Sequence, residues 1–82
     1  MINVAKFKGK VVENGLSLRE VAKAINIDKS TLYRKLSKNG DDFTIKQADE
    51  LVKLLHLSAE EAMSIFFSQF VAYTQQMANE GG

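Results

Sequence analysis

Three short capping signals limit most strongly what this 82-residue chain can fold into. Each is a Ser or Thr followed three residues later by Glu or Gln, standing just before an apolar pattern of helical spacing. The pairs are Ser17 with Glu20, Thr44 with Gln47, and Ser58 with Glu61. In such a capping box, each side chain accepts a hydrogen bond from the other residue's otherwise free backbone amide. The sequence therefore predicts three helix starts at these positions.

Two further helices follow from apolar spacing. A first helix is predicted over residues 3–13 from Val4, Phe7 and Val11, with Val12 widening the apolar stripe. Asn14-Gly15 ends it, because Asn and Gly tolerate the left-handed backbone of a helix stop, and Leu16 supplies the apolar contact that often follows. Another helix is predicted over about 28–37, with Asp28 as its N-cap and Leu32 and Leu36 pointing inward.

Together these elements predict an all-α, compact five-helix domain over residues 1–67. The inward residues predicted for the last two helices are Ile45, Ala48, Leu51, Val52, Leu55, Ala62, Ile65 and Phe66. Residues 68–82 form a C-terminal aromatic tail that suits either a helix extension or a short strand, since its β-branched and aromatic residues fit both burial patterns.

Charge is divided unevenly along the chain. Residues 1–46 hold ten Lys or Arg and five acids, a net +5, whereas residues 47–82 hold one Lys and five acids, a net −4. A cationic half of this kind attracts a polyanion. Cys is absent and no apolar run reaches the length that spans a bilayer, so we expect a cytoplasmic protein with no membrane association.

The segment from Leu18 to Leu36 resembles the helix-turn-helix of the lambdoid phage repressor and Cro family, the XRE-type transcriptional regulators. The residues that carry this resemblance are Ala22, Ile25, Ile27 and Leu32. Two positions depart from the family pattern. Asn26 stands where Gly is frequent, and Lys35 stands where an apolar residue is usual, so we expect Leu36 to serve as the second inward anchor after a slight rotation of the helix.

The resemblance implies a lambda-repressor-like domain that reads double-stranded DNA with its recognition helix, about residues 28–37, in the major groove. It places the base contacts on Lys29, Ser30 and Arg34. Candidate contacts to the DNA backbone are Ser17, Arg19, Thr31, Tyr33, Lys38, Asn39 and Lys46. For Tyr33, partial burial is an equal alternative. We therefore expect a sequence-specific repressor or Cro-like regulator of transcription, and the resemblance to phage proteins makes a phage origin one alternative.

The tail supports two further hypotheses. Four of its residues are predicted to form a homodimer contact: Phe67, Phe70, Val71 and Tyr73. Such a contact would let two recognition helices read half-sites one DNA turn apart, whereas closing the core is the other use for these side chains. Alternatively, the aromatic tail makes the chain a protein-binding adaptor of the antirepressor or antitoxin kind. A DNA-bending architectural factor is a third alternative.

Catalysis finds little support in the sequence. The single His, His56, lies between two Leu residues and is expected to act as a helix cap or to be partly buried. The acidic pairs lie in loops or at helix starts, where the helix dipole already explains Glu, and no Gly-rich phosphate loop occurs. We expect no enzyme activity, metal site, cofactor or small-molecule ligand.

Overall fold

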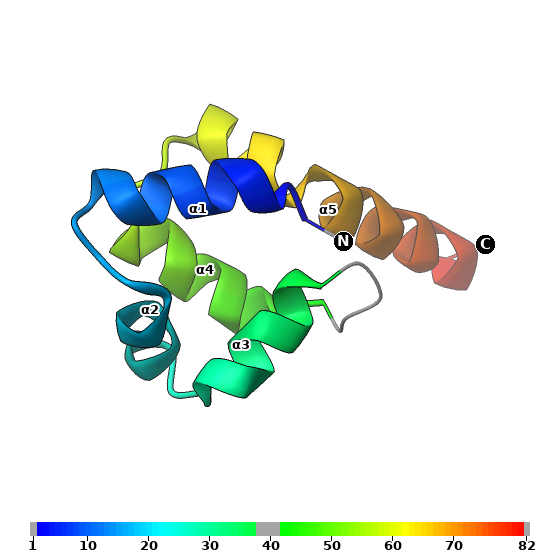
Figure 1. The fold of residues 1–82 in the computed structure, drawn as a ribbon. Helices are drawn as coiled ribbons and strands as arrows, with labels where there is room; N and C mark the ends of the chain where they lie inside the picture. Colours follow the sequence, from blue (N-terminus) through cyan, green and yellow to red (C-terminus); the bar gives the residue numbers. More distant parts are fainter. Residues whose placement is uncertain (1, 38–41, 82) are drawn as a thin grey trace.

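The computed structural model describes residues 2–37 and 42–81, with the side chains of Phe70 and residues 72–81 left out. Over this part of the chain it is all-α, as predicted. The helices are α1 (Val4–Glu13), α2 (Leu18–Ala24), α3 (Lys29–Leu36), α4 (Ile45–Leu54) and α5 (Ala59–Gly81). The first four helices and the start of α5 form one body, and the rest of α5 extends away from it (Figure 1).

One core receives residues from all five helices. The largest fully buried side chains are Phe7, Val21, Leu32, Leu51, Leu55, Ile65 and Phe66. Phe43, in the segment before α4, lies among them with its ring centroid 6.2 Å from that of Phe7 and 6.1 Å from that of Phe66. Residues far apart in sequence therefore meet around this one aromatic side chain.

All three predicted capping boxes are formed. The hydroxyl oxygens of Ser17, Thr44 and Ser58 each accept a hydrogen bond from the backbone amide three residues later, at 3.0–3.1 Å. The returning side-chain oxygens of Glu20, Gln47 and Glu61 accept from the cap amides at 2.9–3.0 Å. The helix starts at α2, α4 and α5 are thus local properties of the sequence.

Helices α1, α2 and α4 end in the same way. Gly15, Asn26 and His56 follow them with left-handed φ angles of 69°, 60° and 53°. In each case the next residue's amide reaches back five residues, as from Leu16 to the carbonyl of Val11 at 3.0 Å and from Ile27 to that of Ala22 at 2.9 Å. This is the Schellman arrangement, which satisfies carbonyls that the helix leaves unpaired. The predicted stop at Asn14-Gly15 is confirmed, and exposed His56 occupies the position that closes α4.

Two predicted core residues are exposed. Val12 is 75% exposed and Ile45 is 58% exposed, so both inward assignments were wrong. Neighbouring helical residues are separated by about 100° around the axis, which turns Val12 away from buried Val11. Ile45 is the first residue of α4 and lies about 60° around the axis from buried Ala48, at the margin of the stripe. In both helices the buried stripe is narrower than the apolar pattern.

The tail forms a continuation of α5, which decides between the helix and strand alternatives. Helix α5 runs through residue 81 without interruption. Gln69, two residues beyond the predicted end of the folded domain, is buried, and its Oε1 accepts a hydrogen bond from the Phe43 amide at 3.0 Å. Among the described residues, no helix has the length and apolar character required to cross a membrane.

Candidate nucleic-acid interface

Helices α2 and α3 are joined by a tight turn whose residues explain its geometry. Asn26 adopts the left-handed conformation at φ 60°, which Asn tolerates better than most residues. Ala22 is buried where the two helices approach each other, and Ile25 is buried at the turn. The Asn at this position, where the resembled family often has Gly, therefore serves the same conformational purpose.

Helix α3 buries one stripe and exposes the remainder. Its buried residues are Leu32 and Leu36, which confirms that Leu36 is the second inward residue. Lys35 is half-buried, and its ammonium donates a hydrogen bond to the carbonyl oxygen of Asp42 at 3.0 Å and lies 5.6 Å from the centroid of the Phe43 ring. Lys35 thus replaces an apolar residue by packing its stem and placing its charge on the segment before α4.

The three predicted base-reading residues share the outer face of α3. Lys29, Ser30 and Arg34 are all exposed, and Arg34 lies one turn beyond Ser30. The ammonium of Lys29 lies 5.4 Å from the ring centroid of Tyr33, one turn along the same helix. Tyr33 is 45% exposed, so its ring contributes to the surface rather than to the core. The outer face of α3 therefore combines two cations, hydroxyl groups and an aromatic ring.

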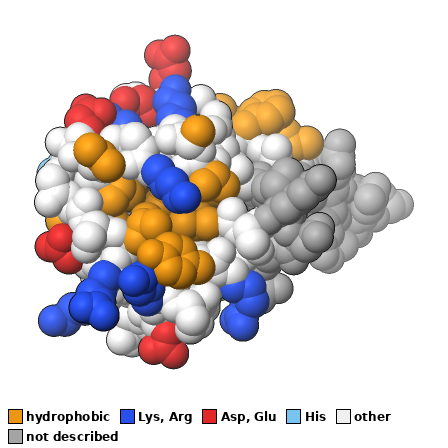
Figure 2. Space-filling view, in the orientation of Figure 1, with side chains coloured by type: hydrophobic (Ala, Val, Ile, Leu, Met, Phe, Trp, Pro, Cys, Tyr) orange, Lys and Arg blue, Asp and Glu red, His pale blue; other side chains and the backbone are white. Residues whose placement is uncertain are grey.

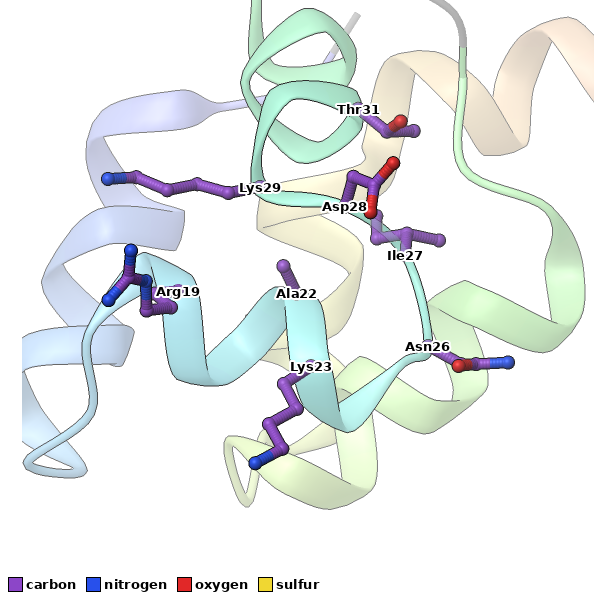
Figure 3. A pocket seen from close by; sticks show the side chains of 8 residues that line it. All are labelled: Arg19, Ala22, Lys23, Asn26, Ile27, Asp28, Lys29 and Thr31. Carbon is purple, nitrogen blue, oxygen red and sulfur yellow. The ribbon is translucent and has the colours of Figure 1, made fainter.

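An open groove of about 560 Å³ lies beside the turn. Its lining comes from α2, the turn and the first turn of α3: Arg19, Ala22, Lys23, Asn26, Ile27, Asp28, Lys29 and Thr31. Figure 3 shows the side chains of Arg19 and Lys29 extending toward the same end of α2, while Asp28 and Thr31 lie on the other side of α3's first turn. Cations and an acid thus occupy different sides of one surface.

The candidate backbone contacts fall into three groups. Arg19, Tyr33 and Lys46 are exposed and Thr31 is half-buried, so the side chain of each is accessible to a ligand. Ser17 is exposed, but its amide and its hydroxyl oxygen are both engaged with Glu20 in the capping box, which leaves its hydroxyl hydrogen as a donor. Lys38 and Asn39 lie outside the described residues.

Basic side chains lie on the exposed faces of α2 and α3. Figure 2 shows Lys and Arg side chains grouped over α2 and α3, with apolar surface between them and α1. The exposed cations of the two helices are Arg19, Lys23, Lys29 and Arg34. The acids in the same segment are Glu20, which belongs to the capping box, and Asp28. Part of the positive charge of residues 1–46 therefore lies on the exposed surface of α2 and α3.

The predicted dimer residues are only partly described. Phe67 is 56% exposed and Val71 is half-buried, whereas the side chains of Phe70 and Tyr73 lie outside the description. Met63, one turn before Phe67, is 48% exposed and extends the same apolar face, which sequence reasoning missed. The i, i+4 spacing of Met63 and Phe67 on α5 was the signal that could have found it.

The arrangement can present a rigid polar helix to a ligand, because buried residues on α2 and α3 fix the two helices against the same core. Phe43 and Gln69 were also missed by sequence reasoning, since their link joins residues 26 positions apart and leaves no local pattern. In comparisons with models of protein families, with curated proteins and with solved structures, none matches the chain.

Proposed function

We propose that this protein is a sequence-specific regulator of transcription that binds double-stranded DNA with α3 in the major groove. The observation that carries the proposal is the division of α3: Leu32 and Leu36 fix it to the core, while Lys29, Ser30 and Arg34 share an exposed face. A helix held by a second helix across a tight turn can enter the major groove with its first turn against base edges. The resemblance to the lambdoid repressor and Cro family supports the same placement.

Each residue has a role that follows from its chemistry. Arg34 suits guanine, which accepts two hydrogen bonds at O6 and N7, and Lys29 suits the same acceptors. The Ser30 hydroxyl can donate or accept a hydrogen bond, so it is compatible with more than one base. Arg19, Thr31, Tyr33 and Lys46 would contact phosphates and supply affinity that falls with salt, together with the hydroxyl of Ser17. This division assigns sequence preference to α3 and general affinity to the surrounding surface.

A homodimer on DNA is part of the proposal. Between Glu61 and Glu80 lie 18 residues without a charged side chain, and the described part of this stretch exposes Met63 and Phe67. An uncharged helix face can pair with a copy of itself without repulsion between like charges. Two copies would then read paired half-sites about one DNA turn apart. We place this activity in the cytoplasm, in keeping with the absence of Cys.

The test is selection of bound duplexes from a random DNA pool at two salt concentrations, with the unaltered protein and with Arg34→Ala. Lys53→Ala is the matched control, because it removes one exposed cation from α4, outside the helix pair. We expect an enriched motif of paired half-sites, relaxed at one position in each by Arg34→Ala and unchanged by Lys53→Ala. If no motif is enriched and weak binding fades with salt, the proposal is wrong and a backbone-gripping or DNA-bending role takes its place.

A second candidate function rests on the exposure of Met63 and Phe67. These side chains would serve a protein-binding adaptor of the antirepressor or antitoxin kind. Phe67→Ala separates the two functions when binding to a selected duplex is measured at high protein concentration. Survival of DNA binding under these conditions supports the regulator, whereas capture of a protein partner that needs Phe67 and ignores Arg34 supports the adaptor.

A further inference from the structure

The start of α3 differs from the other helix starts of the chain. The N-cap side chains of α1, α2, α4 and α5 each accept a hydrogen bond from a backbone amide of the first turn: Asn3, Ser17, Thr44 and Ser58. Asp28 occupies the N-cap position of α3 with extended backbone, and its carbonyl accepts from the Leu32 amide at 3.0 Å. Its carboxylate, however, makes no such capping hydrogen bond.

Within the part of the chain that the structure describes, no cation pairs with the carboxylate of Asp28. The nearest cation in sequence, Lys29, points away from it and lies over the Tyr33 ring. Asp28 is exposed, and it lines the open groove next to Thr31, where Figure 3 shows the two side chains on the same side of α3. Among the described residues, no hydrogen bond or ion pair holds this carboxylate in place.

An exposed acid at this position has an electrostatic cost for a DNA-binding surface. The phosphates of DNA repel a carboxylate, and Asp28 lines the same groove as Arg19, Lys23 and Lys29, with Arg19 and Lys29 extending on the other side of the first turn of α3. Glu20, the other acid of the helix pair, is explained by its capping box, but Asp28 is explained by neither a cap nor an ion pair. A carboxylate gains in a major groove only where it faces a hydrogen-bond donor on a base edge.

We propose that Asp28 is a specificity-determining residue that accepts a hydrogen bond from the exocyclic amine of cytosine in the operator. This inference rests on the proposed function. Cytosine presents N4–H₂ as a donor in the major groove, whereas guanine presents two acceptors, O6 and N7, that repel a carboxylate. Asp28 therefore complements Lys29 and Arg34, which favour guanine. Together they define a half-site that contains guanine and, next to it, a position where cytosine is required.

The experiment compares selection from a random duplex pool, followed by binding titrations, for the unaltered protein and Asp28→Asn. Asp49→Asn is the matched control, since it removes one exposed acid from α4. We expect Asp28→Asn to change the preferred base at one position of each half-site from cytosine toward adenine, which Asn reads at N6 and N7. Affinity for the original site relative to the changed site should fall about tenfold or more, while Asp49→Asn keeps the original motif.

Other outcomes are equally decisive. If Asp28→Asn selects the original motif and binds all duplexes more tightly to the same degree, Asp28 is only a repulsive charge and the inference is overturned. A motif that relaxes with Arg34→Ala but not with Asp28→Asn also overturns the inference and leaves the proposed function standing. If the unaltered protein enriches no motif, the proposed function itself fails. Thermal unfolding of Asp28→Asn and of Asp28→Ser, a second variant with a capping side chain, verifies that the comparison is made on folded protein.

Discussion

Helices α3 and α5 are fixed to the same core by different means. Helix α3 has eight residues and is held by Leu32, Leu36 and the inward-turned Lys35. Helix α5 has 23 residues and adds to its apolar contacts four polar links, three to α1 and its N-cap and one to the segment before α4. These links join Glu61 to Lys10 at 2.8 Å, Ser64 to Lys6 at 3.0 Å, the Ile65 carbonyl to the Asn3 amide at 2.9 Å and Gln69 to the Phe43 amide at 3.0 Å.

This difference determines which kind of side chain each helix exposes to solvent. The first half of α5 links Glu61, Ser64 and Gln69 to other parts of the chain, and its exposed side chains include the large apolar Met63 and Phe67. Helix α3 relies on its buried stripe and on one lysine, which leaves most of its polar groups facing solvent. A ligand that needs hydrogen bonds would therefore find them on α3, whereas α5 offers an apolar contact.

Leu32→Ala should have the largest effect, because α3 depends on so few buried side chains. Leu32 is fully buried, and replacing a buried Leu by Ala costs about 2–5 kcal/mol of unfolding free energy. Chemical denaturation measures this loss. Leu32→Met is the control, since a volume-conserving change costs less than about 1.5 kcal/mol. A small effect of Leu32→Ala would show that α3 is held mainly by contacts other than its apolar stripe.

Gln69→Leu tests the polar attachment of α5. The substitution preserves volume but leaves the buried Phe43 amide without an acceptor, which costs about 1–3 kcal/mol. Ser68→Ala, at the adjacent exposed position of α5, should change stability by less than about 0.5 kcal/mol. Equal denaturation midpoints for Gln69→Leu and the unaltered protein would mean that the link contributes nothing and that α5 is held by apolar contacts alone.

The contrast between the two helices also separates what the sequence could predict from what it could not. Starts at Ser17, Thr44 and Ser58 were predictable because both partners of a capping box lie within four residues. The exposed set on α3 followed from the placement of Leu32 and Leu36 within a resembled motif. Gln69 with Phe43 joins residues far apart in sequence, and no periodicity encodes such a pair.

Two other features could not be predicted from the sequence pattern: the width of a buried stripe and the hydrogen bonding of an N-cap side chain. Val12 and Ile45 were misplaced because an apolar pattern gives the direction of a stripe better than its width. Asp28 was correctly predicted as the N-cap residue, yet residue type alone could not reveal that its side chain makes no capping hydrogen bond. That second difference appears only in the geometry, and the proposed cytosine contact depends on it.

The turns that precede α3 and α5 offer a smaller test. Asn26 and His56 both adopt left-handed φ angles, but Asn tolerates this conformation better than His. Replacement of His56 by Gly should relieve about 1 kcal/mol of backbone strain in the folded state. Part of this gain in stability is offset, because Gly has greater conformational freedom in the unfolded chain. We expect a net gain of about 0.5 kcal/mol for His56→Gly and less for Asn26→Gly, measured by thermal unfolding. A larger gain at Asn26 would contradict this ranking.

The pair of Lys10 and Glu61 should give the smallest effect, one that depends on pH. The hydrogen bond from Lys10 and then that from the Ser58 amide lower the pKa of Glu61 from 4.5 to about 2. Because the carboxylate is favoured in the folded state, its stabilisation is complete above about pH 4.5 and is lost as the pH falls toward about 2. The same pairing raises the pKa of Lys10 above 10.5, so its contribution persists through neutral pH.

Glu61→Gln therefore should lower stability at pH 7 and differ progressively less from the unaltered protein below about pH 4. Urea denaturation from pH 7 to pH 3 measures this convergence. Glu60→Gln is the control, because it removes the same charge from the adjacent exposed position without breaking the 2.8 Å contact to Lys10. Parallel curves for Glu61→Gln and the unaltered protein over the whole range would show that the ion pair does not hold α5 against α1. The attachment of α5 would then depend on its buried apolar face and on Gln69. In that case α5 would resemble α3, which is held mainly by its buried apolar residues.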